Sequence, residues 1–158
     1  MKKIISTANA PAAIGPYSQA VEVNGTLYIS GQIPIIPQTG KIAEGGITEQ
    51  TKQVMKNIGA ILEAAGYSYS NVVKSTCLLS DMDNFKAMNE VYAACYPENP
   101  PARAAFAVKN LPLGVLIEIE TVAAKWAEDG KPETGNSRSE TKQGDRETGN
   151  FINFAYHF

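Results

Sequence analysis

Two kinds of hydrophobic pattern follow one another along the chain and predict its elements. A β-branched or alternating pattern, typical of strands, covers Ala20 to Val23, Thr26 to Ser30, Asn71 to Leu79, Arg103 to Val108 and Val115 to Lys125. The first two strands flank Asn24-Gly25, a pair that tolerates the positive φ values of a tight hairpin turn. Pro34, Pro37 and Gly40 then predict a loop.

A helical pattern, with apolar residues three and four positions apart, covers two other segments. The first runs from Thr48 to Ala65, with Gly66 placed to end it. The second begins near Asp81 or Asp83, either of which can cap a helix, and continues to about Tyr96. The resulting order β-β-α-β-α-β-β predicts an α+β sandwich with both helices on one face of the sheet.

The composition changes after Trp126 and divides the chain into residues 1–126 and residues 127–158. The second part is polar and repeats ETGN at positions 133–136 and 147–150, which is typical of a flexible tail. Its last eight residues, FINFAYHF, contradict that interpretation with four aromatic side chains. We therefore expect this end to dock on residues 1–126 or on a neighbouring subunit, unless it is an extension added to this protein alone.

The charge of the chain argues against several partners. Residues 1–126 carry 10 basic and 10 acidic side chains and residues 127–158 carry 4 and 6, so the net charge of −2 lies in the second part. The neutral first part has no basic stripe for a nucleic-acid groove. Neither a membrane span nor a signal peptide is expected. Cys77 and Cys95 stand far apart, as in a cytoplasmic protein with reduced thiols.

The inventory of reactive side chains narrows the chemistry further. His157 is the only histidine, so a Ser-His-Asp or Cys-His site within residues 1–126 is not expected. A zinc ion would have too few ligands, and the glycine patterns of common nucleotide loops are absent. An enzyme with this inventory must use carboxylates, hydroxyls, arginine, backbone groups and water, without a metal or another cofactor.

The last predicted strand has two carboxylates on one face. Because side chains alternate between the faces of a sheet, the residues at 115, 117, 119 and 121 should face the helices. The opposite face carries Leu116, Glu118, Glu120 and Val122. Such a mixture suits a subunit interface or a cleft, although two solvated strand glutamates are the commoner case.

Arg103 follows two prolines in a run of alanines and has no carboxylate near it in sequence. Its guanidinium is suited to hold a planar anion in a bidentate grip. A structural salt bridge to Glu118 or Glu120 is an equally good interpretation. Asn89, on the second helix, is more typical of a helix surface than of a ligand contact.

Other polar residues stand beside glycines and prolines in GPYSQA and SGQIP. There Tyr17, Ser30 and Gln32 are candidates for ligand contacts, because glycines let a backbone approach a ligand closely, but ordinary turns have the same composition. Both cysteines are expected in the core.

The segment P-A-R-A-x-F-x-x-K-x-L, followed five residues later by I-E-I, resembles the diagnostic segment of the Rid family, also called the YjgF-like family. NAPAAIGPYSQA, YISGQIP and the PPAR junction match in the same order, so the resemblance covers about Ile4 to Lys125. It implies a chorismate-mutase-like fold with a mixed sheet. Three subunits would join their sheets into a central barrel, with the active sites between subunits.

The same resemblance implies roles for five residues. Arg103 would hold the carboxylate of the substrate, Glu118 would position the attacking water, and Tyr17, Ser30 and Gly31 would contact the substrate. The best-known members are 2-iminobutanoate/2-iminopropanoate deaminases, which remove reactive imines released by pyridoxal-phosphate enzymes. The implied reaction is therefore hydrolysis of small 2-imino acids to 2-oxo acids and ammonia.

Two points of the resemblance stay open. Ala105 stands where some members have a cysteine, so regulation through a thiol is not expected there. Family members have also been named ribonucleases and translation inhibitors. A protein that binds small molecules in the same clefts without turnover is a further alternative.

Overall fold

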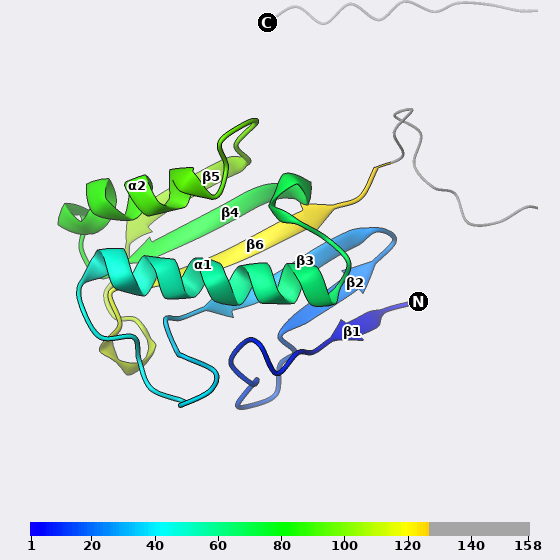
Figure 1. Cartoon of the computed structure of the whole chain (residues 1–158), viewed down its shortest axis with the longest axis horizontal. Helices are drawn as coiled ribbons and strands as arrows, with labels where there is room; N and C mark the ends of the chain where they lie inside the picture. The colour runs from blue at the N-terminus through cyan, green and yellow to red at the C-terminus, as the bar shows by residue number, and fades with distance from the viewer. Residues whose placement is uncertain (127–158) are drawn as a thin grey trace, which may run out of the picture.

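The computed structural model describes residues 1–126, which form one six-stranded sheet with two helices on one of its faces (Figure 1). The strands are β1 (Lys3–Ile5), β2 (Ala20–Val23), β3 (Thr26–Gln32), β4 (Val72–Leu79), β5 (Ala102–Ala107) and β6 (Ile117–Ala124). The helices are α1 (Ile47–Ala64) and α2 (Phe85–Ala94). The predicted α+β fold with both helices on one face is confirmed.

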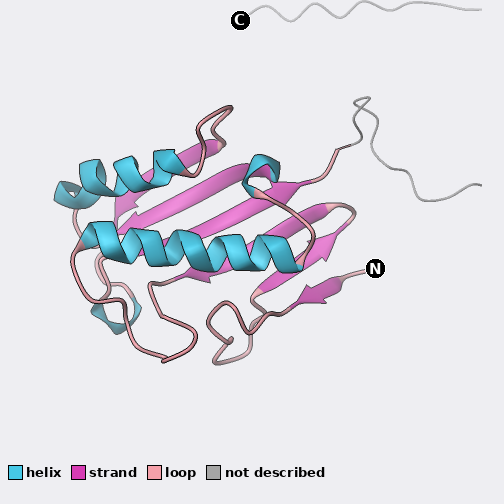
Figure 2. Cartoon of the chain, viewed as in Figure 1, coloured by secondary structure: helices cyan, strands magenta, loops and turns pink. Residues whose placement is uncertain are grey.

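The sheet is mixed, with the strand order β1-β2-β3-β6-β4-β5 (Figure 1). Figure 2 shows both helices in front of the strands, on one face of the sheet. Only β4 and β5 pair in parallel; the other neighbours are antiparallel. The predicted hairpin joins β2 to β3, and both turn residues, Asn24 and Gly25, have positive φ values of 50° and 75°. Strand β1 was not predicted, because three residues are too few to show a period.

The hydrophobic core lies between the sheet and the helices. The apolar stripe of α1 contributes Val54, Ile58, Ile61 and Leu62, and every second residue of β6 from Ile117 is buried against it. The predicted alternation along β6 is therefore confirmed. Full burial of such side chains stabilises the fold by about 1.5–3 kcal/mol each.

Helix α2 begins later than predicted. The side chain of Asp81 accepts a hydrogen bond from the backbone N–H of Asp83 and thereby caps a short 3₁₀ turn, Met82–Asn84, instead of the helix itself. The α-helical residues start at Phe85. This shift matters because Phe85 and Asn89 face the sheet edge at β5.

The face of the sheet opposite the helices is uncovered in the single chain. Tyr28 and Phe106 are 54% and 48% exposed on it, and Leu78 and Val122 are half-buried beside them. No helix within the described residues is long and apolar enough to cross a membrane. The predicted boundary after residue 126, and the expected docking of residues 151–158, lie outside the described residues.

Candidate active site

Arg103 is held on the helix side of the sheet by three residues of α2. One guanidinium nitrogen, Nη1, donates a hydrogen bond of 2.8 Å to Oδ1 of Asn89. The central carbon of the guanidinium lies 4.8 Å from the centre of the Tyr92 ring and 5.4 Å from that of Phe85. Asn89 follows Phe85 by four residues and precedes Tyr92 by three, so all three side chains lie on the face of α2 that contacts the arginine.

This arrangement bears on one of the two interpretations of Arg103, the salt bridge within the chain. Within residues 1–126 the guanidinium forms no ion pair, so the salt bridge to Glu118 or Glu120 is not formed. Asn89, predicted to be a surface residue, is half-buried and is the one side chain in that range that accepts a hydrogen bond from Arg103. Two guanidinium nitrogens remain available for a ligand, beside a pocket of about 320 Å³ that Pro100, Pro101 and Tyr96 also line.

Glu118 lies on the opposite face of the sheet, against the backbone of β3. A Cβ atom added at Gly31 would overlap the Glu118 carboxylate, so this close approach requires glycine there. Glu118 is half-buried, whereas Glu120, two residues along the same face, is exposed. The prediction of two solvated glutamates therefore fits only Glu120.

The environment of Glu118 favours its protonated form. Partial burial raises the pKa of this carboxyl above its usual range, and the nearby charge of Glu120 adds to the increase. A carboxylate with a raised pKa is a stronger base than a solvated one, and it can accept a proton from water more readily.

The segment that carries Tyr17 is anchored by Gln19, whose importance the sequence did not reveal. The buried amide of Gln19 donates hydrogen bonds to the carbonyl oxygens of Thr7, Ala10 and Pro11 and accepts one from the N–H of Thr7. These bonds tie the loop between β1 and β2 to the sheet. Tyr17, at the end of this loop, is 53% exposed.

Tyr17, Gly31 and Gln32 line one pocket of about 300 Å³. The structure thus brings together three of the residues predicted near the start of the chain. Ser30 lies next to Gly31, but its hydroxyl donates a hydrogen bond of 2.7 Å to the carbonyl of Ser18. A ligand could use only the remaining lone pairs of this oxygen.

The predicted site residues therefore form two groups that one chain does not bring together. Arg103 projects from the helix side of the sheet, where Asn89 holds it. Glu118 projects from the other side, beside Gly31. A small ligand cannot touch both side chains of the same chain, because the sheet separates them.

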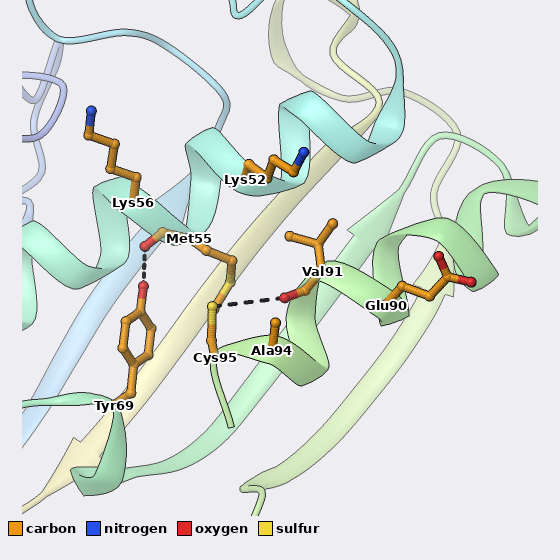
Figure 3. A pocket seen from close by; sticks show the side chains of 8 residues that line it. All are labelled: Lys52, Met55, Lys56, Tyr69, Glu90, Val91, Ala94 and Cys95. Atoms are coloured by element: carbon orange, nitrogen blue, oxygen red, sulfur yellow. Dashed lines mark hydrogen bonds between the residues drawn. The ribbon is translucent and has the colours of Figure 1, made fainter. Parts of the chain in front are cut away.

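A third pocket, of about 480 Å³, lies between α1 and α2 and contains none of the predicted site residues (Figure 3). Cys95, expected in the core, is half-buried and lines this pocket, whereas Cys77 is fully buried as predicted. Within residues 1–126, no group of three or more histidine, cysteine, aspartate or glutamate side chains could hold a metal ion.

Comparison with known proteins identifies the family. The family described as endoribonuclease L-PSP matches residues 7–125. The chain belongs to this family. It is also called the Rid or YjgF-like family, so the prediction made from the sequence motifs is confirmed.

Individual relatives cover nearly the whole of residues 1–126. A RutC family protein of Pyrococcus horikoshii is 57% identical over 125 residues, which are 79% of this chain and 99% of that protein. The human 2-iminobutanoate/2-iminopropanoate deaminase is 54% identical over 123 residues, 78% of this chain and 90% of the human protein. A crystal structure of a Rid family protein from Yersinia pestis has a TM-score of 0.77 at 47% identity and covers 79% of this chain and 100% of that one.

Proposed function

We propose that this protein is an enzyme that hydrolyses small 2-imino acids to 2-oxo acids. Water adds across the C=N bond, so that its oxygen binds the carbon and one of its protons goes to the nitrogen. The C–N bond then breaks as the C=O bond forms, and ammonia leaves with both protons of the water. The observation that carries the proposal is the 54% identity to the human protein named 2-iminobutanoate/2-iminopropanoate deaminase. Such a reaction would clear reactive imines released by pyridoxal-phosphate enzymes.

Arg103 would bind the carboxylate that every 2-imino acid carries. The guanidinium is already oriented by Asn89, Tyr92 and Phe85, so binding costs little side-chain entropy. Two of its nitrogens are available for a bidentate grip, which would fix the position of the neighbouring C=N carbon. The half-buried position strengthens this charge-assisted contact relative to one in water.

Glu118 would hold the attacking water and accept one of its protons. Its raised pKa suits this role, because a general base works best when its pKa approaches the working pH. Positioned proton transfer of this kind typically contributes about 10²–10⁴-fold to a rate. Imines already hydrolyse in water, so the remaining contribution that the site must supply is orientation.

The separation of Arg103 and Glu118 supports an active site built from two subunits. If the uncovered sheet faces of three subunits met in a central barrel, the Glu118 side of one chain could approach the Arg103 edge of the next. The exposed Tyr28 and Phe106 on that face are the kind of side chains that an interface buries. We therefore propose a homotrimer with three shared sites, in which Tyr17, Ser30 and Gly31 line the wall next to Glu118.

Two further parts of the proposal rest on composition. The unpaired thiols of Cys77 and Cys95 support a cytoplasmic location. The balanced charge of residues 1–126 and the lack of a histidine among them argue against cleavage of RNA, although the family description names an endoribonuclease.

A competition assay tests the activity. Threonine dehydratase and threonine generate 2-iminobutanoate, which semicarbazide traps, and an imine hydrolase lowers the yield of trapped product. We expect the wild-type protein to lower it and a folded Arg103→Ala variant to leave it unchanged. No effect of the wild type would contradict the proposed reaction and favour a protein of this fold that only binds its ligand.

A further inference from the structure

The pocket between α1 and α2 has fixed walls. The Tyr69 hydroxyl donates a hydrogen bond to the carbonyl of Met55, and its ring meets Tyr96 edge-on with 5.5 Å between ring centres. Gly59 makes room for this contact, since a Cβ atom there would lie 2.9 Å from the Tyr69 oxygen. Because this wall is already ordered, binding of a ligand would not carry the entropic cost of ordering it.

The floor of this pocket is apolar and its two sides differ in charge. Met55, Tyr69, Val91, Ala94 and Cys95 provide the apolar surface. Figure 3 shows Lys52 and Lys56 on the α1 side and Glu90 on the α2 side.

The two lysines are available to a ligand. Within residues 1–126, Lys56 forms no ion pair, and Lys52 has one at 3.7 Å with Glu49. Both side chains of that pair are at least half exposed, so the ion pair contributes little to the stability of the fold. A bound anion could therefore replace Glu49 as the partner of Lys52. Lys52 and Lys56 are four residues apart, so their Cβ atoms lie about 5–6 Å apart on one face of α1. Figure 3 shows their ammonium groups turned away from each other, and rotation of the two flexible side chains would bring both to one carboxylate.

We propose that this pocket binds a small amphipathic carboxylate, with its apolar body on Met55, Val91 and Ala94 and its carboxylate between Lys52 and Lys56. A volume of about 480 Å³ lies within the range typical of small-molecule sites. The site shares no residue with the proposed deaminase site, so it does not depend on that function. In the proposed trimer it would lie on the outer, helix-covered side of each subunit.

Cys95 provides a reporter inside the pocket. Burial raises the pKa of its thiol, so alkylation by iodoacetamide should be slow enough to follow by peptide mass spectrometry. Cys77 is fully buried, and its labelling would reveal unfolding. The experiment measures the alkylation rate of Cys95 in the full chain with increasing 4-phenylbutanoate, and with 4-phenylbutanol as the uncharged match.

We expect phenylbutanoate to slow the alkylation of Cys95 in a saturable manner and phenylbutanol to bind more weakly. Replacing Lys52 and Lys56 together by glutamine should weaken phenylbutanoate binding about two- to fivefold per lysine and leave phenylbutanol unaffected. Lys86→Gln, an exposed change on α2 outside the pocket, is the matched control. Ala94→Trp should fill the pocket and remove the protection by both compounds.

Three results would overturn the proposal. The first is an unchanged Cys95 rate at high phenylbutanoate. The second is equal protection by the alcohol, which would mean that no charge is recognised. The third is loss of protection in Arg103→Ala, which would place the binding at the deaminase site. Conversely, protection that survives Arg103→Ala would support this pocket even if no imine hydrolysis were found.

Discussion

The guanidinium of Arg103 lies 4.8 Å from the centre of the Tyr92 ring, and Asn89 accepts its hydrogen bond one helical turn earlier on α2. The arginine that the sequence placed among alanines is thus oriented by residues 11 and 14 positions before it. The ring of Tyr92 makes this contact, and its hydroxyl has no hydrogen-bond partner within the described residues.

The first prediction concerns this ring. Tyr92→Leu should raise the KM for the imine about 2- to 30-fold, which corresponds to the loss of one cation–π contact, with a smaller change in kcat. Tyr92→Phe keeps the ring and should restore the KM to within about twofold of the wild-type value, since it removes only a hydroxyl without a partner. Steady-state kinetics on both variants checks this. Equal defects in both would mean that the hydroxyl, not the stacking, is important.

The second prediction concerns pH. Burial and the charge of Glu120 raise the pKa of Glu118. As the pH is lowered, kcat/KM should therefore begin to fall at a higher pH than it would if the base were a solvated glutamate. Glu120→Gln removes the neighbouring negative charge and should shift this fall to lower pH while retaining activity. A pH profile of kcat/KM for both proteins measures the shift. If the acid side of the profile stays at the same pH in Glu120→Gln, ionisation of Glu118 does not control the fall in kcat/KM.

The raised pKa also has a consequence for stability. A carboxyl whose pKa is higher in the folded than in the unfolded state lowers the free energy of unfolding when it is ionised in both states, which is the case above the folded pKa. Below the unfolded pKa the carboxyl is protonated in both states, and this destabilisation disappears. Glu118→Gln should therefore raise the Tm at neutral pH, lose this advantage in acid, and abolish hydrolysis. Thermal unfolding at two pH values tests this third prediction. A lower Tm at neutral pH would indicate that the carboxylate makes stabilising contacts in the assembly.

The fourth prediction concerns Gly31. A methyl group there would overlap the Glu118 carboxylate, so Gly31→Ala should displace the proposed base and lower kcat by at least about tenfold. Gly46→Ala is the matched control, because no atom lies near its added methyl group and its φ of −90° suits alanine. Circular dichroism should show both variants folded. Full activity of Gly31→Ala would exclude this position of Glu118 from the mechanism.

The sequence predicted the features that follow from the local hydrophobic period of a strand or helix. It did not predict the roles of residues that act through contacts with distant parts of the chain. The alternation along β6 assigned Glu118 and Ile117 to opposite faces correctly, because side chains of a strand alternate regardless of their neighbours. The roles of Asn89 and Gln19 could not be predicted in this way. Both act on partners 8 to 14 residues away that only the folded chain brings close.

The motifs also grouped residues that the single chain separates. Arg103 and Glu118 belong to one motif of the sequence, the segment that runs from P-A-R-A to I-E-I, yet they lie on opposite faces of the sheet. No pattern within one chain can show that two copies complete a site. The partly exposed, apolar face with Tyr28 and Phe106 is the structural observation that supports the shared site proposed above.

The most direct test of the account is complementation between two inactive variants. Arg103→Ala and Glu118→Gln subunits, each inactive alone, are unfolded together, refolded as mixed trimers and assayed for imine hydrolysis. If each site takes Arg103 from one subunit and Glu118 from another, random mixing should restore roughly a quarter of the wild-type activity. Mixed trimers, verified by mass, that remain inactive would contradict a shared site.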